Sequence, residues 1–177
     1  MNSKPRKNKI LFVKPPDRFL EDEFVYQQLG PHYLQSYLEK FEIPSDILLL
    51  YERSEARKKR ETGEFYDLSL EHLNMLFLGA DGKSDDKDFD DSIFQDYDII
   101  GLSVMSPQAS DAYLVSQLIN ALYPHITTVI GGSHARYYQT QVESLPEPIA
   151  FDFIVPQDGW APIYKIASGQ IQKTKKS

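Results

Sequence analysis

Small and hydroxyl-bearing residues follow two neighbouring apolar segments in the second half of the chain. Ser103 ends the first of these segments and Ser106 lies three residues later, whereas Gly131 and Gly132 directly follow the second. Glycine leaves space beside the backbone, and a serine hydroxyl offers one donor and two acceptor positions without a charge. These residue types predict space for a bulky, mostly uncharged ligand.

Five short apolar segments have to position these residues, and amphipathic stretches separate them. The segments have strand length and are rich in β-branched and aromatic residues. They span residues 9–13, 47–51, 97–103, 126–130 and 151–155. Parallel strands need helical, right-handed crossovers. The sequence therefore predicts an α/β fold: a flavodoxin-like, doubly wound parallel sheet of five strands in the order 2-1-3-4-5.

Four helices are expected to cover this sheet. Apolar residues recur at helical spacing in three stretches. The first stretch carries Leu34, Tyr37, Leu38 and Phe41, the second Ala112, Val115, Ile119 and Leu122, and the third Tyr138, Val142 and Leu145. Ser106 is the expected N-cap of the second helix, with Pro107 in its first turn. Residues 161–167 form the fourth helix.

In such a sheet, ligands bind beyond the carboxyl ends of the strands, near the point where the strand order reverses. The loops to inspect are therefore residues 14–17, 103–108, 131–136 and 156–160. The first of these reads Lys14-Pro15-Pro16-Asp17. It has neither the glycine-rich turn of a dinucleotide site nor a Walker lysine, which excludes both kinds of nucleotide site.

The composition excludes further classes of function. The chain has 177 residues, a formal net charge of -7 and no cysteine. The missing cysteine removes disulfides, thiolate zinc sites and iron–sulfur clusters, and the negative charge argues against nucleic-acid binding. No apolar stretch reaches the roughly 18 residues that span a bilayer. We expect a cytoplasmic protein with no membrane partner.

The domain prediction places one α/β domain over residues 9–170. A basic arm at residues 1–8 precedes it, and a basic tail at residues 171–177 follows it. Residues 52–94 are strongly charged at both ends and are predicted to be an insertion. Within them, Leu70, Leu73, Leu76 and Phe77 fit a short amphipathic helix with Gly79 as its C-cap.

Several stretches together resemble one known family. GLSVMSPQASDAYLVSQLIN, TTVIGGSHA and FDFIVPQDGW, with ILFVKPP and LGPHYLQSYLEKF near the start, are similar to the N-terminal cobalamin-binding domain of cobalamin-dependent radical SAM enzymes. The resemblance covers most of residues 9–170 apart from the insertion. It implies that cobalamin binds at the carboxyl edge of the sheet.

The resemblance also implies roles for individual residues. Ser103 would hydrogen-bond the dimethylbenzimidazole tail, and Gly131 and Gly132 would keep side chains away from that tail. Ser133 and His134 would lie near the corrin, while Gln157-Asp158-Gly159 replaces a usual G-E-G-E sequence. The full set of expected cofactor-binding residues is Pro16, Ser103, Val104, Met105, Ser106, Gln108, Gly131, Gly132, Ser133, His134, Gln157, Asp158 and Gly159.

Two missing motifs define the expected subtype. Without D-x-H-x-x-G, cobalamin would bind base-off with no histidine below cobalt; without C-x-x-x-C-x-x-C, this chain holds no iron–sulfur cluster. No catalytic residue or protein metal ligand is expected. The resemblance therefore implies a cofactor module that works with a radical SAM domain or partner protein, most commonly in methyl transfer.

The alternative is a flavodoxin-like protein-interaction domain that binds no cofactor and uses the charged insertion to contact a partner. The residues named above could also have purely structural roles. Gly131-Gly132 is a possible strand-to-loop turn, and His134 a possible surface histidine. Val104 and Met105 could simply pack the core.

Overall fold

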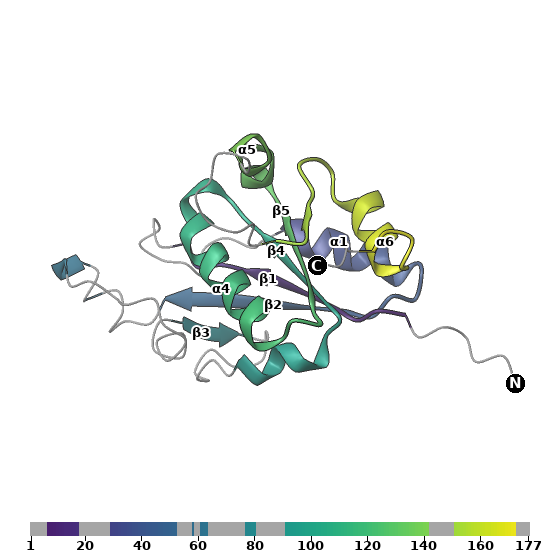
Figure 1. Ribbon diagram of the computed structural model, residues 1–177, viewed down its shortest axis with the longest axis horizontal. Helices are drawn as coiled ribbons and strands as arrows, with labels where there is room; N and C mark the ends of the chain where they lie inside the picture. The colour runs from purple at the N-terminus through teal and green to yellow at the C-terminus, as the bar shows by residue number, and fades with distance from the viewer. Residues whose placement is uncertain are drawn as a thin grey trace, which may run out of the picture.

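A six-stranded sheet forms the centre of the protein. The computed structural model describes residues 7–17, 29–52, 58, 61–63, 77–80, 91–141 and 151–172. The strands are β1 (Ile10–Lys14), β2 (Ser45–Glu52), β3 (Phe77–Ala80), β4 (Ile99–Ser103), β5 (Thr127–Gly131) and β6 (Phe153–Ile154). Figure 1 shows the sheet with helices packed against it.

The strand order is β3-β2-β1-β4-β5-β6. β1, β2, β4, β5 and β6 are mutually parallel, which confirms the predicted five-stranded parallel sheet in the order 2-1-3-4-5. The fold is a flavodoxin-like α/β fold.

The structure adds β3, which pairs antiparallel with the outer edge of β2. The prediction of a helix ending at Gly79 is therefore wrong for residues 77–80. A four-residue apolar run has no reliable periodicity of its own, and the free edge of β2 offers it backbone partners. The rest of that predicted helix lies outside the described residues, as do most of the insertion and both tails.

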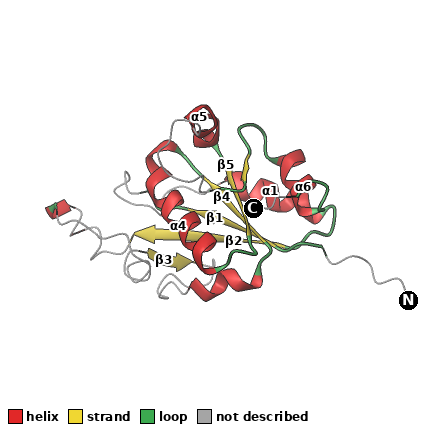
Figure 2. Ribbon diagram, viewed as in Figure 1, coloured by secondary structure: helices red, strands yellow, loops and turns green. Residues whose placement is uncertain are grey.

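The helices lie in two layers, one on each face of the sheet. The helices are α1 (Leu29–Glu39), α4 (Ala109–Leu122), α5 (Ser133–Gln141) and α6 (Trp160–Ala167). Two short 3-10 turns, Asp91–Asp96 and Ser106–Gln108, precede β4 and α4. α4 and α5 pack on one face, whereas α1 and α6 pack on the other. Figure 2 shows helices around the yellow strands.

Strand residues alternate between these two cores. Leu11 and Leu102 face α4, and Ile10, Phe12 and Val129 face α1 and α6. This is the period of two that β-strands impose on their side chains. Both faces are apolar, as expected for a parallel sheet covered on both sides.

Two predicted details of α4 are wrong, although Ala112, Val115 and Ile119 are fully buried as expected. Leu122, the last residue of the helix, is 42% exposed. Ser106 is not the N-cap of α4; it starts a separate 3-10 turn after Met105. On α5, Tyr138 is buried, and Val142 and Leu145 lie outside the described residues.

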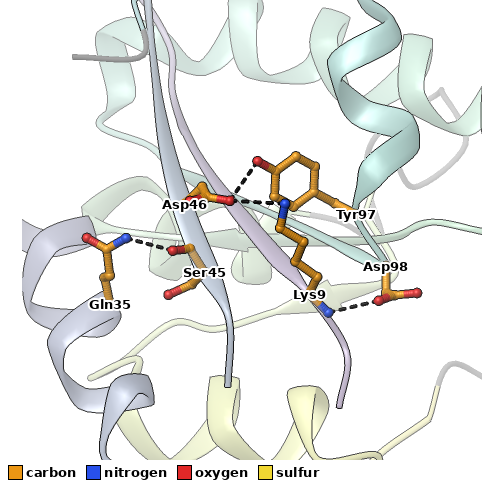
Figure 3. A network of polar contacts seen from close by, with 6 residues as sticks. All are labelled: Lys9, Gln35, Ser45, Asp46, Tyr97 and Asp98. Carbon is orange, nitrogen blue, oxygen red and sulfur yellow. Dashed lines mark hydrogen bonds and ion pairs between the residues drawn. The ribbon is translucent and has the colours of Figure 1, made fainter. Parts of the chain in front are cut away.

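Polar contacts hold the amino ends of β1, β2 and β4 together, on the edge of the sheet away from the predicted ligand loops. The Tyr97 hydroxyl donates to Asp46 Oδ2 at 2.9 Å, and Lys9 Nζ lies 3.2 Å from the same oxygen. The Lys9 amide donates to Asp98 Oδ2 at 2.8 Å. Figure 3 shows this network joining the three strands. Burial and the Asp46 hydrogen bond raise the pKa of Tyr97 above its usual value, so the hydroxyl stays protonated.

Among the described residues, no helix is both long and apolar enough to cross a membrane.

Candidate ligand-binding site

A pocket of about 640 Å³ lies between the sheet and the helices α1 and α6, at the carboxyl ends of β4, β5 and β6. Pockets of roughly 300–1,000 Å³ hold drug-sized ligands and cofactors. This is the edge at which parallel sheets of this class bind their ligands.

Two rows of strand residues make the floor of the pocket, and three of these residues, Gly101, Ser103 and Gly131, are small. In the first row, Gly101 lies between Phe12 of β1 and Val129 of β5. In the second row, Ser103 lies beside Gly131. Gly101 and Ser103 are two residues apart and therefore face the same side of the sheet. Gly101, Ser103 and Gly131 are neighbouring positions on two strands, and their small size leaves room between the sheet and the helices α1 and α6.

The walls come from helices and are mostly apolar. Leu34 of α1 and Ile163 of α6 line the pocket together with Val155, which follows β6. Gly159 brings the loop before α6 close to α1: a Cβ at this position would lie 3.2 Å from Leu34 Cδ2. Aromatic rings continue the wall outward, since Tyr33 and Trp160 have ring centroids 6.3 Å apart and both line the pocket.

Polar residues gather where the pocket opens. We call six of the exposed lining residues, Gly132, Ser133, Arg136, Gln157, Asp158 and Trp160, the pocket mouth; Gly30 and Tyr33 of α1 are exposed as well. Deeper in the pocket, Ser103 carries the hydroxyl of the floor; among the described residues, that hydroxyl has no recorded hydrogen-bond partner. A ligand with an apolar ring and a polar, solvent-facing remainder fits this distribution.

The structure brings seven of the predicted site residues together in this pocket. They are Ser103, Gly131, Gly132, Ser133, Gln157, Asp158 and Gly159. The other six do not line it: Pro16, Val104, Met105, Ser106, Gln108 and His134. Val104 is buried in the core on the α4 side of the sheet, as its structural reading predicted.

Gln108 belongs to a buried polar cluster at the carboxyl end of β1, and Pro16 is a buried residue of the loop that contributes to this cluster. Lys14 and Asp17 form an ion pair there, and Gln108 Nε2 donates to Asp17 Oδ1 and, at 3.1 Å, to the Pro15 carbonyl. Gln108 Oε1 accepts the Met105 amide at 2.8 Å. The loop of residues 14–17, which was expected to face a ligand, is instead closed on itself.

His134 is buried on the opposite face of the sheet, and each of its two ring nitrogens contacts one hydroxyl group. Its Nε2 lies 2.7 Å from the Tyr113 hydroxyl, and its Nδ1 lies 3.1 Å from Ser106 Oγ. Burial lowers the pKa of His134 and raises the pKa of Tyr113 to about 12, so both groups are neutral near pH 7. Both ring nitrogens are engaged, and His134 holds the segment of Ser106 against α5.

The lowered pKa of His134 predicts a loss of stability in acid. A histidine that stays neutral when folded binds protons more readily when unfolded, so stability is present above the unfolded pKa and falls as the pH drops below about 6.5. We expect the free energy of unfolding to fall by up to about 1.4 kcal/mol per pH unit in that range. Urea denaturation of the wild type and His134→Gln at several pH values measures it; equal slopes for both proteins would contradict it.

Several pocket residues were not among the predicted site residues. Gly101 had a signal, because period-two alternation from Ser103 places it on the same face. Leu34 was predicted on the inner face of its helix but not at a ligand. Arg136 and Trp160 lay within the loops chosen for inspection. Phe12 and Ile163 had no signal beyond being apolar, because which core residues border a hollow depends on packing across strands.

Comparisons of the chain with protein-family models, with curated proteins and with solved structures find no match. Within the described residues, no group of three His, Asp or Glu side chains is placed to hold a metal ion. We therefore infer the function from the pocket and from the sequence motifs that line it.

Proposed function

We propose that the chain is a cobalamin-binding module and that the pocket takes the nucleotide tail of the cofactor. The observation that carries this proposal is the group of three small residues, Gly101, Ser103 and Gly131, that lies under the helices α1 and α6. They open a slot at the edge of the sheet where the resemblance expects the tail.

The residues present fit the chemistry of that tail. A benzimidazole ring is flat and apolar and has one exposed ring nitrogen when it is not bound to cobalt. Leu34, Val129 and Ile163 offer apolar surface to such a ring, and the Ser103 hydroxyl can donate to its nitrogen. Burying one such ring contributes roughly 1.5–3 kcal/mol, the gain for a large apolar side chain.

The corrin would lie outside the pocket, over the carboxyl edge of the sheet. Bound cobalamin supplies cobalt–carbon chemistry such as methyl transfer, whereas this chain supplies orientation and a dry tail site. Both ring nitrogens of His134 are hydrogen-bonded, and His72 lies outside the described residues. Because the sequence has no D-x-H-x-x-G motif, we propose base-off binding without a histidine from this chain below cobalt. The reacting partner in this proposal is a radical SAM domain or protein.

The test is retention of the cofactor. The purified chain is mixed with hydroxocobalamin and desalted, and its visible spectrum is recorded. We expect a retained corrin with a base-off spectrum. A colourless protein would contradict the proposal and support the alternative of a cofactor-free protein-interaction domain.

A substitution in the pocket tests whether the tail binds there. A Cβ at Gly131 has ordinary space, since its nearest heavy atom is the Leu102 carbonyl oxygen at 4.0 Å. The larger side chain of Gly131→Leu would fill the slot, so we expect cobalamin affinity to fall by roughly 100-fold at little cost in stability. Ser110→Leu adds the same side chain to α4, on the other face of the sheet, and should bind normally. Unchanged binding by Gly131→Leu would place the tail elsewhere.

A further inference from the structure

We infer that Arg136 and Ser133, at the pocket mouth, form a phosphate subsite for the ligand in the pocket. This inference rests on the proposed function and adds a charge contact to it. Cobalamin carries one phosphodiester, which links the benzimidazole riboside to the corrin side chain. A ring buried on the pocket floor would leave that phosphodiester near the mouth.

The two residues share one face of α5. Ser133 and Arg136 are three residues apart, so their side chains are neighbours on the helix surface. Both line the pocket, and both are exposed. A guanidinium with an adjacent hydroxyl offers the forked donors that suit phosphate oxygens.

The charges around the pocket favour this assignment. Among the described residues that line it, Arg136 is the only basic side chain and Asp158 the only acidic one. No ion pair is recorded for Arg136 within the described part of the chain. The whole chain has a net charge of -7 and repels anions, so a phosphate at this edge needs a local cation.

Two backbone amides at the start of α5 are already used by the turn that follows β5. The amide of His134 donates to the Val104 carbonyl at 3.0 Å, and the amide of Ala135 donates to the Gly132 carbonyl at 3.1 Å. The side chains of Arg136 and Ser133 add donors that these two amides do not offer to a ligand.

The experiment compares two corrinoids that differ in the tail. Cobinamide has the same corrin as cobalamin but lacks the ribose, the base and the phosphodiester. Affinities are measured by equilibrium dialysis for the wild type, Arg136→Gln, Arg136→Lys and Lys165→Gln. Lys165 is exposed on α6 outside the pocket lining, so its variant matches the change in net charge.

We expect Arg136→Gln to bind cobalamin about tenfold more weakly and cobinamide unchanged, because a charge-assisted hydrogen bond contributes about this much. Arg136→Lys should keep part of the affinity, and Lys165→Gln should keep all of it. Added salt should weaken cobalamin binding more in the wild type than in Arg136→Gln.

Two results would overturn the subsite while leaving the proposed function in place. One is wild-type cobalamin affinity in Arg136→Gln, and the other is an equal loss for both corrinoids, which would assign Arg136 to the corrin or to the fold. A wild-type chain that binds neither corrinoid would instead overturn the proposed function, and the subsite with it. Circular dichroism of each variant confirms that it is folded.

Discussion

Replacing Asp17 with asparagine is expected to lower the free energy of unfolding by about 3–5 kcal/mol, the usual cost of leaving one member of a buried ion pair alone. Lys14 and Asp17 expose only 1% and 0% of their surface. Asparagine keeps the shape of the side chain and removes its charge. Among the described residues, Lys14 would then remain buried at the end of β1 without an ion-pair partner.

The double variant Lys14→Met/Asp17→Leu tests whether the loss in Asp17→Asn comes from the unpaired charge of Lys14. Replacing both charges with apolar groups removes the desolvation cost together with the attraction, and such replacements are often neutral. We expect the double variant to recover most of the stability that Asp17→Asn loses. Chemical denaturation of the single and double variants gives the coupling energy of the two positions.

An exposed ion pair on the same chain provides the matched control. Lys7 Nζ lies 3.1 Å from Glu42 Oε2, with 41% and 79% of these side chains exposed. Glu42→Gln should cost about 0–1 kcal/mol, as surface pairs do. If Asp17→Asn costs no more than Glu42→Gln, the pair at Lys14 is hydrated in solution and the buried cluster described above is incorrect.

This cluster also shows why the sequence did not predict the buried contacts of the loop after β1. A lysine, two prolines and an aspartate at a strand end are typical of an exposed loop, and the switch point of such sheets usually faces a ligand. The i,i+3 ion pair between Lys14 and Asp17 is sealed by Gln108, which lies 91 residues later than Asp17. No local pattern contains a contact over that separation.

The strand order and most helices were predictable because they depend on local patterns and on chain connectivity. Continuous apolar runs identify the buried strands, and right-handed crossovers leave few ways to arrange them. β3 was not predictable, since a four-residue segment has too few positions to distinguish a strand from a helix. Its place is set by the free edge of β2.

The candidate site was predictable on the sheet and less so on the helices. Ser103 and Gly131 occupy strand ends, and their register follows from the strand order. His134 follows the same glycine pair but turns to the other face, where Tyr113 of α4 and Ser106 hold it. That direction is decided by the turn at Gly132, whose backbone conformation the sequence suggests but does not specify.

Gly132→Ala is the second substitution for which we expect a large effect. It should lower the free energy of unfolding. Gly132 has φ of +87°, and a Cβ there would lie 2.6 Å from the Val104 carbonyl oxygen and 2.7 Å from the Val104 nitrogen. Alanine must therefore adopt a disfavoured backbone conformation and also push the main chain of β5 away from Val104. We expect a loss of about 2–4 kcal/mol, the sum of such strain and a weakened hydrogen bond.

The neighbouring glycine is the control for this prediction. Gly131→Ala has ordinary space and should change stability by no more than about 0.5 kcal/mol. Two hydrogen bonds join the turn to Val104, from the Val104 amide to the Gly131 carbonyl at 2.9 Å and from the His134 amide to the Val104 carbonyl at 3.0 Å. Equal urea midpoints for Gly132→Ala and Gly131→Ala would contradict this close approach. A real difference means that Gly132 shapes the turn that carries Ser133 and Arg136, whereas the role proposed for Gly131 is tested separately by cobalamin binding to Gly131→Leu.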